Sequence, residues 1–306
     1  MGFRNIESVS TLRDFADVLK TRPPDLALCD AQGGEEVCRI IQALRQEPDS
    51  PNPFVIVLVM AWSINADLMN SFSNAGVDGL ILRPFSTSVL KQRIAAHTSS
   101  RKRFVVTSEY VGPDRREEQS RPLGAVLLDP PNSLMIKTDG RSEPIAAARK
   151  VHTELHAARA ELDLQKLKSD SIRLCILGEL LKDATEGDTR HKEMLGQMTA
   201  LINGIERRGR KTYPDLFRCL QSIQQVVARL RGGDEYDSCL ATFQQQAVEL
   251  ARMFQPEKSV DQLLDELLAT VAIVRARQNL QAAPMRTEYL GPVDKVWQPK
   301  RYRGKR

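Results

Sequence analysis

Asp30 is the residue of this 306-residue chain whose position most directly suggests chemistry. It follows the apolar run Leu26–Cys29, which has the composition of a buried strand. In a parallel sheet covered by helices, ligands bind in the crevice at the carboxyl ends of the strands. The sequence therefore predicts that the Asp30 carboxylate lies at the rim of such a sheet.

Other polar residues have weaker claims to a functional role. His152 and His156 have the i,i+4 spacing of one helix face, but no HExxH motif accompanies them, and we expect an exposed polar face. His191, in TRHKEML, lacks the sequence surroundings of a phosphotransfer histidine and is expected at the surface of a helix start. Asp25 and Asp78 are expected to be turn or capping residues.

Three arginines, Arg115, Arg116 and Arg121, resemble the arginine motif with which PilZ-type domains bind cyclic dinucleotides. The spacing from Arg116 to Arg121 is one residue too long, and no DxSxxG-type partner follows, so we prefer a solvated charged linker. The chain contains no GxGxxG, P-loop or GxSxG motif, and nucleotide-dependent or nucleophile-elbow enzymes therefore have no support.

The composition, 42% hydrophobic and 27% charged, is ordinary for a soluble globular protein. The longest apolar run, FVIVLVMAW, ends at Trp62 and is shorter than the roughly 18 residues that a membrane span requires. The N-terminus has no signal-peptide core, so we expect a cytoplasmic protein. Its five cysteines are scattered without CxxC spacing, which predicts reduced and mostly buried thiols.

Residues 1–98 alternate short apolar runs with helical periodicity, a pattern that favours a parallel α/β sheet. The expected strands are Phe3–Val9, Leu26–Cys29, Phe54–Met60 and Leu80–Leu82, and the expected helices are Thr11–Lys20, Glu35–Leu44, Ala66–Asn74 and Thr87–His97. The continuous run Phe54–Met60 is typical of a strand that is covered on both faces.

Residues 99–142 are polar, charged and interrupted by prolines, and are predicted to form an extended Pro/Arg-rich linker. Within it, SEYVGPD at Ser108–Asp114 recurs as TEYLGPV at Thr287–Val293. Two such segments could dock in equivalent grooves, for example across a dimer. A chance similarity between loop-like sequences is the alternative, and the sequence favours neither.

Residues 143–282 are predicted to form a bundle of four or five helices. Apolar residues recur at steps of three and four, which gives each helix one apolar stripe for a helical partner to bury. The first stripe contains Ala148, Val151, Leu155, Ala158 and Leu162. Gly232–Gly233 is expected to end one helix, and Ser259 with Gln262 has the spacing of a capping box.

Residues 283–306 form a basic tail. Seven Lys or Arg residues stand against Glu288 and Asp294, which gives +5 and accounts for the whole formal net charge of the chain. Such a tail suits weak contact with nucleic acid, acidic lipid or an acidic protein patch, and a solvated end without a partner is the alternative that we prefer.

Three segments, PDLALCD (Pro24–Asp30), NPFVIVLVMAW (Asn52–Trp62) and AGVDGLILRPF (Ala75–Phe85), together with the helix that follows, resemble the receiver domain of two-component response regulators. The stretch Phe104–Lys137 resembles the extension of a subset of bacterial receivers, so the match covers about 45% of the chain. The resemblance implies a flavodoxin-like fold in which Asp30 accepts a phosphoryl group from a histidine kinase or phosphotransfer protein. The bundle resembles no family.

The family's first strand, which ends in paired acidic residues that help to hold Mg²⁺, is missing. Asp30 alone cannot form an octahedral magnesium site. Each buried backbone group left unpaired by a deleted central strand would cost roughly 1–3 kcal/mol. Either the true start lies upstream of Met1, which we favour because Met1 falls within the domain, or the second strand pairs directly with the third. Mg²⁺ is expected as a cofactor only if the acidic pair exists upstream.

Three further positions depart from the receiver pattern. Ala61, or Met60 if the register slips by one, stands where the family has a hydroxyl residue at the end of a strand. Leu80 stands at the position of an aromatic switch. Arg83 replaces the family's lysine before a cis-proline, here Pro84. Arginine keeps the charge and can bind phosphate through two nitrogens, but its geometry differs from that of lysine.

These features predict a signalling protein rather than an enzyme. In one hypothesis Asp30 is the phosphoacceptor of a phosphorelay, and the bundle acts on a downstream protein partner because no specific DNA-binding motif appears. In another, the receiver-like fold is a phosphorylation-independent scaffold or adaptor. A third is binding to nucleic acid or a membrane surface through the basic tail. A homodimer is compatible with each of them.

Overall fold

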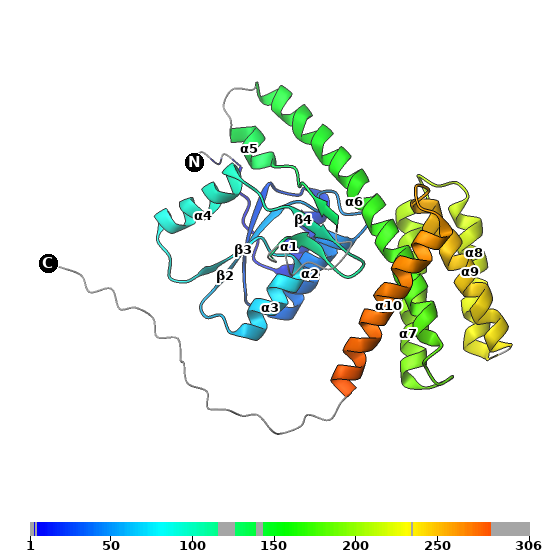
Figure 1. Ribbon diagram of the computed structural model, residues 1–306. Helices are drawn as coiled ribbons and strands as arrows, with labels where there is room; N and C mark the ends of the chain where they lie inside the picture. The colour runs from blue at the N-terminus through cyan, green and yellow to red at the C-terminus, as the bar shows by residue number, and fades with distance from the viewer. Residues whose placement is uncertain (1–2, 4, 116–125, 139–142, 234, 283–306) are drawn as a thin grey trace, which may run out of the picture.

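The computed structural model describes residue 3 and residues 5–115, 126–138, 143–233 and 235–282, and it describes side chains up to residue 276 (Figure 1). The basic tail at 283–306 lies outside this range, and what was expected of it stays a prediction. In the part of the chain that is described, no helix is both long and apolar enough to cross a membrane.

A three-stranded parallel sheet forms the core of the first part of the chain. Its strands, in spatial order, are β1 (Leu26–Asp30), β2 (Ile56–Ala61) and β3 (Gly79–Leu82). The helices around it are α1 (Leu12–Thr21), α2 (Gly34–Gln46), α3 (Ala66–Ala75) and α4 (Thr87–Ser99). These three strands and four helices confirm the predicted elements that follow residue 10.

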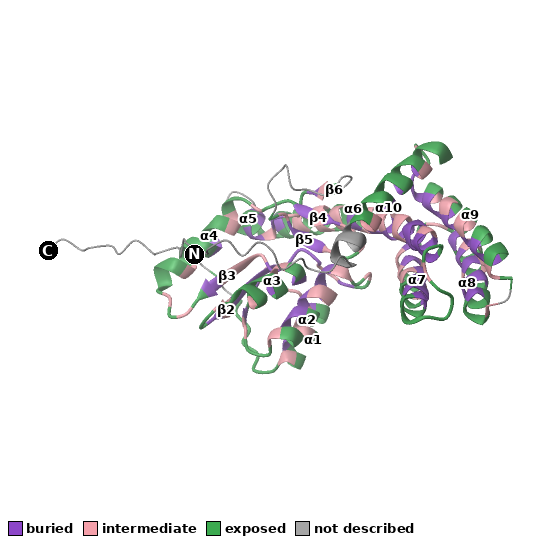
Figure 2. Ribbon diagram, turned by 60° about the horizontal axis from the view of Figure 1, so that its bottom comes forward, coloured by how far each residue is buried: buried purple, intermediate pink, exposed green. Residues whose placement is uncertain are grey.

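Different helices cover the two faces of this sheet (Figure 2). Because side chains alternate along a strand, residues such as Ala27 and Val57 pack with α1, α2 and α3. Ile56 and Leu58 point to the other face and pack with Ile94 of α4. β2 is buried along almost its whole length, which confirms the prediction of a strand covered on both faces.

Short polar residues mark where the helices around the sheet begin. The side chains of Thr11, Asn65 and Ser86 accept backbone hydrogen bonds in the first turns of α1, α3 and α4, respectively. Gly76 ends α3 with a φ of 88°, a left-handed conformation that glycine adopts without steric cost. These caps fix the loops that carry the chain back to the sheet.

The strand predicted at Phe3–Val9 is wrong. The described residues of this run are not in a strand, and Phe3, Ile6 and Val9 are 42%, 82% and 37% exposed. Their apolar side chains have no face to cover, so pairing would bury little surface. Among the described strands β1 pairs only with β2, so direct pairing of this run with Leu26–Asp30 does not occur.

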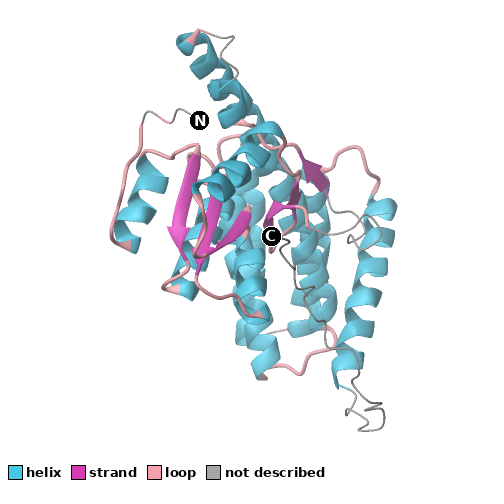
Figure 3. Cartoon of the chain, turned by 90° about the vertical axis from the view of Figure 1, so that its left-hand side faces the viewer, coloured by secondary structure: helices cyan, strands magenta, loops and turns pink. Residues whose placement is uncertain are grey.

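The linker predicted at 99–142 is also corrected, because its described part forms a second sheet (Figure 3). This antiparallel sheet, in the order β5-β4-β6, contains β4 (Phe104–Val106), β5 (Val111–Pro113) and β6 (Val126–Leu128). The short helix α5 (Ser133–Thr138) follows. Phe104, Val106, Val111 and Leu128 are buried, and this apolar cluster explains why the segment folds back on the domain.

In the described residues after 143, the chain forms five helices. They are α6 (Pro144–Leu181), α7 (Thr189–Gly209), α8 (Leu216–Gly232), α9 (Tyr236–Phe254) and α10 (Val260–Ala282). The capping box is confirmed, since the Ser259 amide donates to Gln262 Oε1 at 2.9 Å and the Gln262 amide donates to Ser259 Oγ at 3.2 Å. Gly233 ends α8 with a φ of 77°, as its sequence predicted.

The first apolar stripe has a different partner from the helix that was expected. Leu155, Ala158 and Leu162 of α6 pack against the second sheet and Phe54. The later part of α6, from Leu167 to Leu181, enters the core of the bundle. The 38-residue helix therefore belongs to both parts of the molecule, because a strand surface can bury a helical stripe as well as another helix can.

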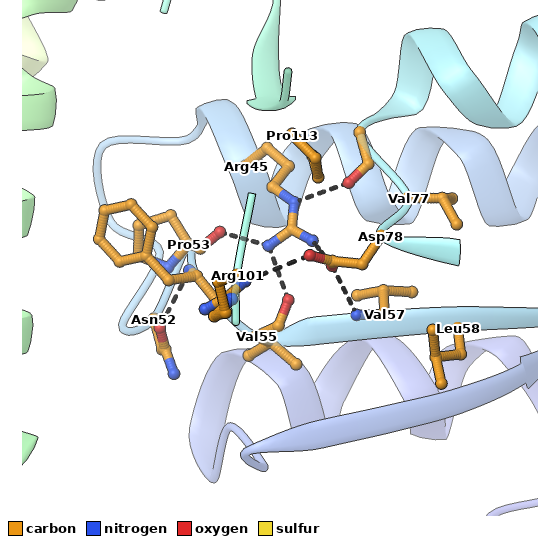
Figure 4. A network of polar contacts seen from close by, with 12 residues as sticks. Arg45, Asn52, Pro53, Val55, Val57, Leu58, Val77, Asp78, Arg101 and Pro113 are labelled. Carbon is orange, nitrogen blue, oxygen red and sulfur yellow. Dashed lines mark hydrogen bonds and ion pairs between the residues drawn. The ribbon is translucent and has the colours of Figure 1, made fainter. Parts of the chain in front are cut away.

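A buried ionic network joins the two sheets (Figure 4). Arg45, which is 1% exposed, donates to Asp78 Oδ2 at 2.7 Å, and Arg101 donates to Asp78 Oδ1 at 3.2 Å. The Val57 amide also donates to Asp78 Oδ2, at 2.8 Å. Both guanidinium groups lie over the Phe104 ring, 5.2 and 5.5 Å from its centre. Asp78 is thus the centre of a network and not a simple turn residue.

Candidate functional site

The carboxyl ends of β1, β2 and β3 form the candidate site. Asp30 is the last residue of β1, Ala61 is the last of β2, and Arg83 follows β3 directly. Backbone hydrogen bonds hold this rim together, from the Ala31 amide to Met60 O and from the Arg83 amide to Ala61 O, each at 2.8 Å. The structure thus brings three of the predicted site residues to one edge of the sheet.

Both oxygens of the Asp30 carboxylate have partners. Oδ1 accepts a hydrogen bond from the Gln32 amide at 3.0 Å, and Oδ2 forms an ion pair with Arg83 Nη1 at 2.7 Å. The side chains of Asp30 and Arg83 are 33% and 27% exposed, so solvent reaches both of them. An ion pair with this exposure stabilises the fold by about 1 kcal/mol at most. Its importance therefore lies in what it does to the site.

Arg83 has three further features. Its guanidinium carbon lies 5.7 Å from the ring centre of Trp62, within the range of a cation–π contact. Nη2 lies 3.8 Å from Met60 Sδ. The Arg83–Pro84 peptide bond is cis, the geometry that the receiver resemblance implied at this position. Trp62 is 65% exposed, so the rim presents an aromatic surface beside a positive charge.

The remaining switch positions offer no polar group to the rim. Ala61 is 2% exposed, and its methyl group can neither donate nor accept a hydrogen bond. Leu80 is partly buried against the cluster that α1, α2 and α3 cover, so it lies on a face of the sheet and not at the rim. The residue of β3 that is exposed is Leu82, at 55%.

The described residues do not fit a magnesium ion. Mg²⁺ requires several oxygen ligands in nearly octahedral geometry. No group of three His, Cys, Asp or Glu side chains suitable for a metal occurs in the described ranges. At the rim, the one carboxylate in position, that of Asp30, is already paired with a cation.

His191 corrects the expectation of a surface histidine. It lies in the first turn of α7 but is only 2% exposed. Its Nδ1 accepts a hydrogen bond from the Gly187 amide at 3.3 Å, and its Nε2 lies 3.1 Å from the Tyr236 hydroxyl. The α8–α9 corner covers the ring because Tyr236, 45 residues later, packs against it. A local sequence pattern cannot reveal such a contact.

The other weak candidates stay apart from the rim. His152 and His156 are exposed on α6, as expected. Arg115 donates to Ser73 Oγ at 2.6 Å and to the Val77 carbonyl, so it is anchored to the α3–β3 corner and is not part of a free linker. Arg116 and Arg121 lie outside the described residues.

None of the five cysteines forms a disulfide, and four of them are buried, which confirms the predicted burial. Desolvation raises the pKa of Cys29 and that of Cys175 to about 12. A thiol with such a pKa is almost entirely protonated at neutral pH and is a poor nucleophile. These groups therefore serve packing and not catalysis.

Comparison with known proteins adds no relative. No family model matches the chain, and no curated protein or solved structure matches it either. The fold and the rim geometry therefore carry the functional conclusions.

Proposed function

We propose that this chain is a response-regulator-like signalling protein whose receiver-like domain works without phosphorylation, as an adaptor that docks other proteins. The observation that carries the proposal is the ion pair between Asp30 Oδ2 and Arg83 Nη1 at 2.7 Å. It places a permanent cation against the carboxylate at the point where an incoming phosphoryl group would have to approach.

Phosphoryl transfer needs more than a carboxylate. Positive charge must neutralise the transferring oxygens, and in receivers a divalent metal supplies it. The ligand set for that metal is not found among the described residues, and Ala61 cannot donate a hydrogen bond to a phosphoryl oxygen. Arg83 is already paired with Asp30, so an incoming phosphoryl group would have to break an existing ion pair.

The arrangement of the sheet supports a flavodoxin-like origin for the domain. Three parallel strands lie side by side in chain order, with α1, α2 and α3 on one face and α4 on the other. This is the order expected of the third, fourth and fifth strands of a flavodoxin-like sheet. The pairing of exposed Trp62 with Arg83 supports docking, because tryptophan and arginine are enriched at the centres of protein interfaces.

A second candidate function is phosphoryl acceptance by Asp30 from a histidine kinase or phosphotransfer protein. The observation that favours it is the position of Asp30, one-third exposed at the rim of a parallel sheet. Arginine also binds phosphate oxygens well, so Arg83 could turn from the carboxylate to a phosphoryl group.

Intact mass measurement separates the two functions. The full chain is incubated with acetyl phosphate and Mg²⁺, beside the variants Asp30→Asn and Arg83→Ala. The adaptor proposal expects no phosphoryl group on the wild-type protein, because the metal ligands and the hydroxyl donor are missing. Arg83→Ala releases Asp30 from its ion pair and should remain unmodified for the same reason.

Asp30→Asn is the matched control, since it removes the nucleophile and changes few other contacts. A wild-type chain that gains one phosphoryl group, while Asp30→Asn gains none, would reject the adaptor proposal and support the second function. A gain in both proteins would identify a different acceptor residue and would contradict both.

A further inference from the structure

Residues 108–113 fit into a narrow site between β4 and the turn that ends α3. β5, an edge strand, pairs through Val111–Pro113 with β4. A tight turn precedes it, in which the Thr107 amide donates to Tyr110 O at 2.8 Å and the Tyr110 amide donates to Thr107 Oγ1 at 3.0 Å. Gln46 Nε2 donates to Glu109 O at 3.0 Å. We call this place the Gly76 site, because Gly76 forms its wall.

Gly112 and Tyr110 make different contacts that hold the segment in the Gly76 site. A Cβ on Gly112 would lie 2.8 Å from the Gly76 Cα and 2.6 Å from the Tyr110 hydroxyl oxygen, so only glycine allows the close approach. The Tyr110 hydroxyl donates to Pro113 O at 3.0 Å and braces the segment. Val111 between them is 1% exposed. The site therefore selects the pattern Tyr-aliphatic-Gly, and the residue after it contributes a backbone carbonyl oxygen.

The same pattern occurs once more in the chain, at 287–292. TEYLGP matches SEYVGP with identical Glu, Tyr, Gly and Pro, and with Thr for Ser and Leu for Val at the other two positions. The match ends after the proline. Asp294 stands where the first copy has Arg115, so the contacts of Arg115 with Ser73 and Val77 have no equivalent. We expect residues 287–292 to bind the Gly76 site more weakly than the resident segment, so they can replace it only at high protein concentration.

The direction of α10 bears on which molecule supplies residues 287–292 to a given Gly76 site. Lys166 of α6 donates to Ser108 O at 2.7 Å, beside the Gly76 site, whereas Glu179 O accepts from Arg275 of α10 at 3.3 Å. Thirteen helical residues separate Lys166 from Glu179, which is about 20 Å at 1.5 Å per residue. Figure 1 shows α10 continuing away from the second sheet.

From Arg275, α10 continues for roughly 10 Å to Ala282, so the two helix segments laid end to end would span about 30 Å. The five residues from Ala282 to Thr287 span about 18 Å at most. These lengths favour the tail of another molecule over the chain's own tail as the source of residues 287–292. The tail of a second molecule is not limited by this length, because the two molecules can approach each other freely.

We propose that residues 287–292 of one copy bind in the Gly76 site of a second copy and displace its resident Ser108–Pro113 segment. β5 has three residues, and among the described strands it pairs only with β4, so its displacement breaks few backbone hydrogen bonds. The exchange would link two molecules through residues 287–292, which lie outside the described residues. It would also explain why the sequence of residues 108–113 is repeated there.

Sedimentation velocity of the full chain over a wide concentration range tests this exchange. We expect the wild-type chain to associate, and Gly291→Val to weaken the association by at least about tenfold, a change of 1.4 kcal/mol, because a side chain there meets the Gly76 backbone. Pro299→Ala is the matched control, since it changes the same tail outside the repeat, and it should behave as the wild type does.

Hydrogen exchange locates the contact. A peptide of residues 284–297 added in excess to the full chain should dissociate the assembly and release the resident segment, which raises exchange at 108–113. The same peptide with Gly291→Val should have neither effect. A wild-type chain that stays monomeric at every concentration, or a Gly291→Val chain that associates as strongly as the wild type, would overturn the proposal.

Discussion

Asp78 shows how much one carboxylate can organise when it is buried between two arginines. Burial lowers the pKa of Arg45 and that of Arg101, and the negative charge of Asp78 opposes the shift in both. Arg45 also donates to the carbonyl groups of Gly76, Pro53 and Val55. Buried charged groups are tolerated here because each of them has partners of opposite charge or hydrogen-bond acceptors. Removing one group leaves another charge buried and unpaired, which destabilises the fold.

We predict that Asp78→Ala lowers the free energy of unfolding by about 3–5 kcal/mol, because it leaves two guanidinium groups buried without their counter-ion. Asp78→Asn keeps an oxygen for the Val57 amide and should lose less. Urea unfolding of the two variants beside the wild type measures both effects. A loss below about 1 kcal/mol for Asp78→Ala would mean that the network does not hold the fold.

Two buried thiols predict sensitivity to alkali. The pKa of Cys29 and that of Cys175 rise from 9.0 to about 12 on folding, chiefly because burial disfavours the thiolate. Below pH 9 both states are protonated, and the thiols have no effect on stability. As the pH rises from 9 towards 12 the unfolded chain loses these protons first, so the free energy of unfolding falls.

The double variant Cys29→Ala/Cys175→Ala should show a shallower fall over the same pH range. Chemical unfolding at several pH values above 9 measures the two slopes. Equal slopes for the variant and the wild type would assign the alkaline loss to other groups, of which Tyr110 is one, because burial also raises its pKa.

Sequence reasoning located the rim residues but not the groups that bond to them. Asp30, Ala61 and Arg83 could be placed because each stands at the end of an apolar strand, and parallel strands end at one edge. The ion pair of Asp30 with Arg83 depends on rotamers and could not be predicted. Asp78 was missed because its partners, Arg45 and Arg101, lie 33 and 23 residues away.

At the scale of elements, the length of each helix or strand determines whether the sequence predicts it. Helices of ten or more residues and the long run at β2 have patterns that a sequence reveals. β4, β5 and β6 have three residues each, and an alternation of apolar and polar residues cannot be recognised over so short a stretch. The run at Phe3–Val9 shows the converse error, since an apolar segment without a surface to cover does not become a strand.

The α3–β3 turn needs glycine at position 76 for two reasons, the left-handed φ and the close approach of the Val111 carbonyl. Gly187, between α6 and α7, has only the left-handed φ, so substitutions at the two positions separate these reasons. Gly187→Ala changes a residue with a φ of 77° in open space, so it should cost only the left-handed strain of about 1–2 kcal/mol. Gly76→Ala has the same strain at a φ of 88°, and its Cβ would lie 2.7 Å from Val111 O. Thermal unfolding should therefore show the larger loss for Gly76→Ala, and equal losses would argue against tight packing of β5.

At the scale of the whole molecule, α6 and a few long side chains hold the α/β part and the bundle together. Lys166 donates to the carbonyl groups of Thr107 and Ser108, and it forms an ion pair with Asp170 at 3.2 Å. Both side chains are less than 10% exposed, and burial lowers the pKa of Lys166 and raises that of Asp170. Arg208 adds contacts from α7 to Asp163 and to Gln46 O.

We predict that Lys166→Met destabilises the chain by about 3–5 kcal/mol, since Asp170 then remains buried without its cation. The double variant Lys166→Met/Asp170→Leu should recover a large part of this loss, because no unpaired charge is left. Hydrogen exchange at 107–110 should rise in both variants, as both lose the donor to these carbonyls. Unfolding curves that show no recovery in the double variant would contradict the assigned cause.

The continuity of α6 also limits how this protein can be divided. Its residues Leu155–Leu162 complete one apolar core and Leu167–Leu181 complete the next, with four residues between them. A protease cut or a truncation between Leu155 and Leu181 would remove apolar side chains from at least one core. Two separately expressed halves should accordingly precipitate or need each other to fold, in contrast to domains joined by a peptide tether.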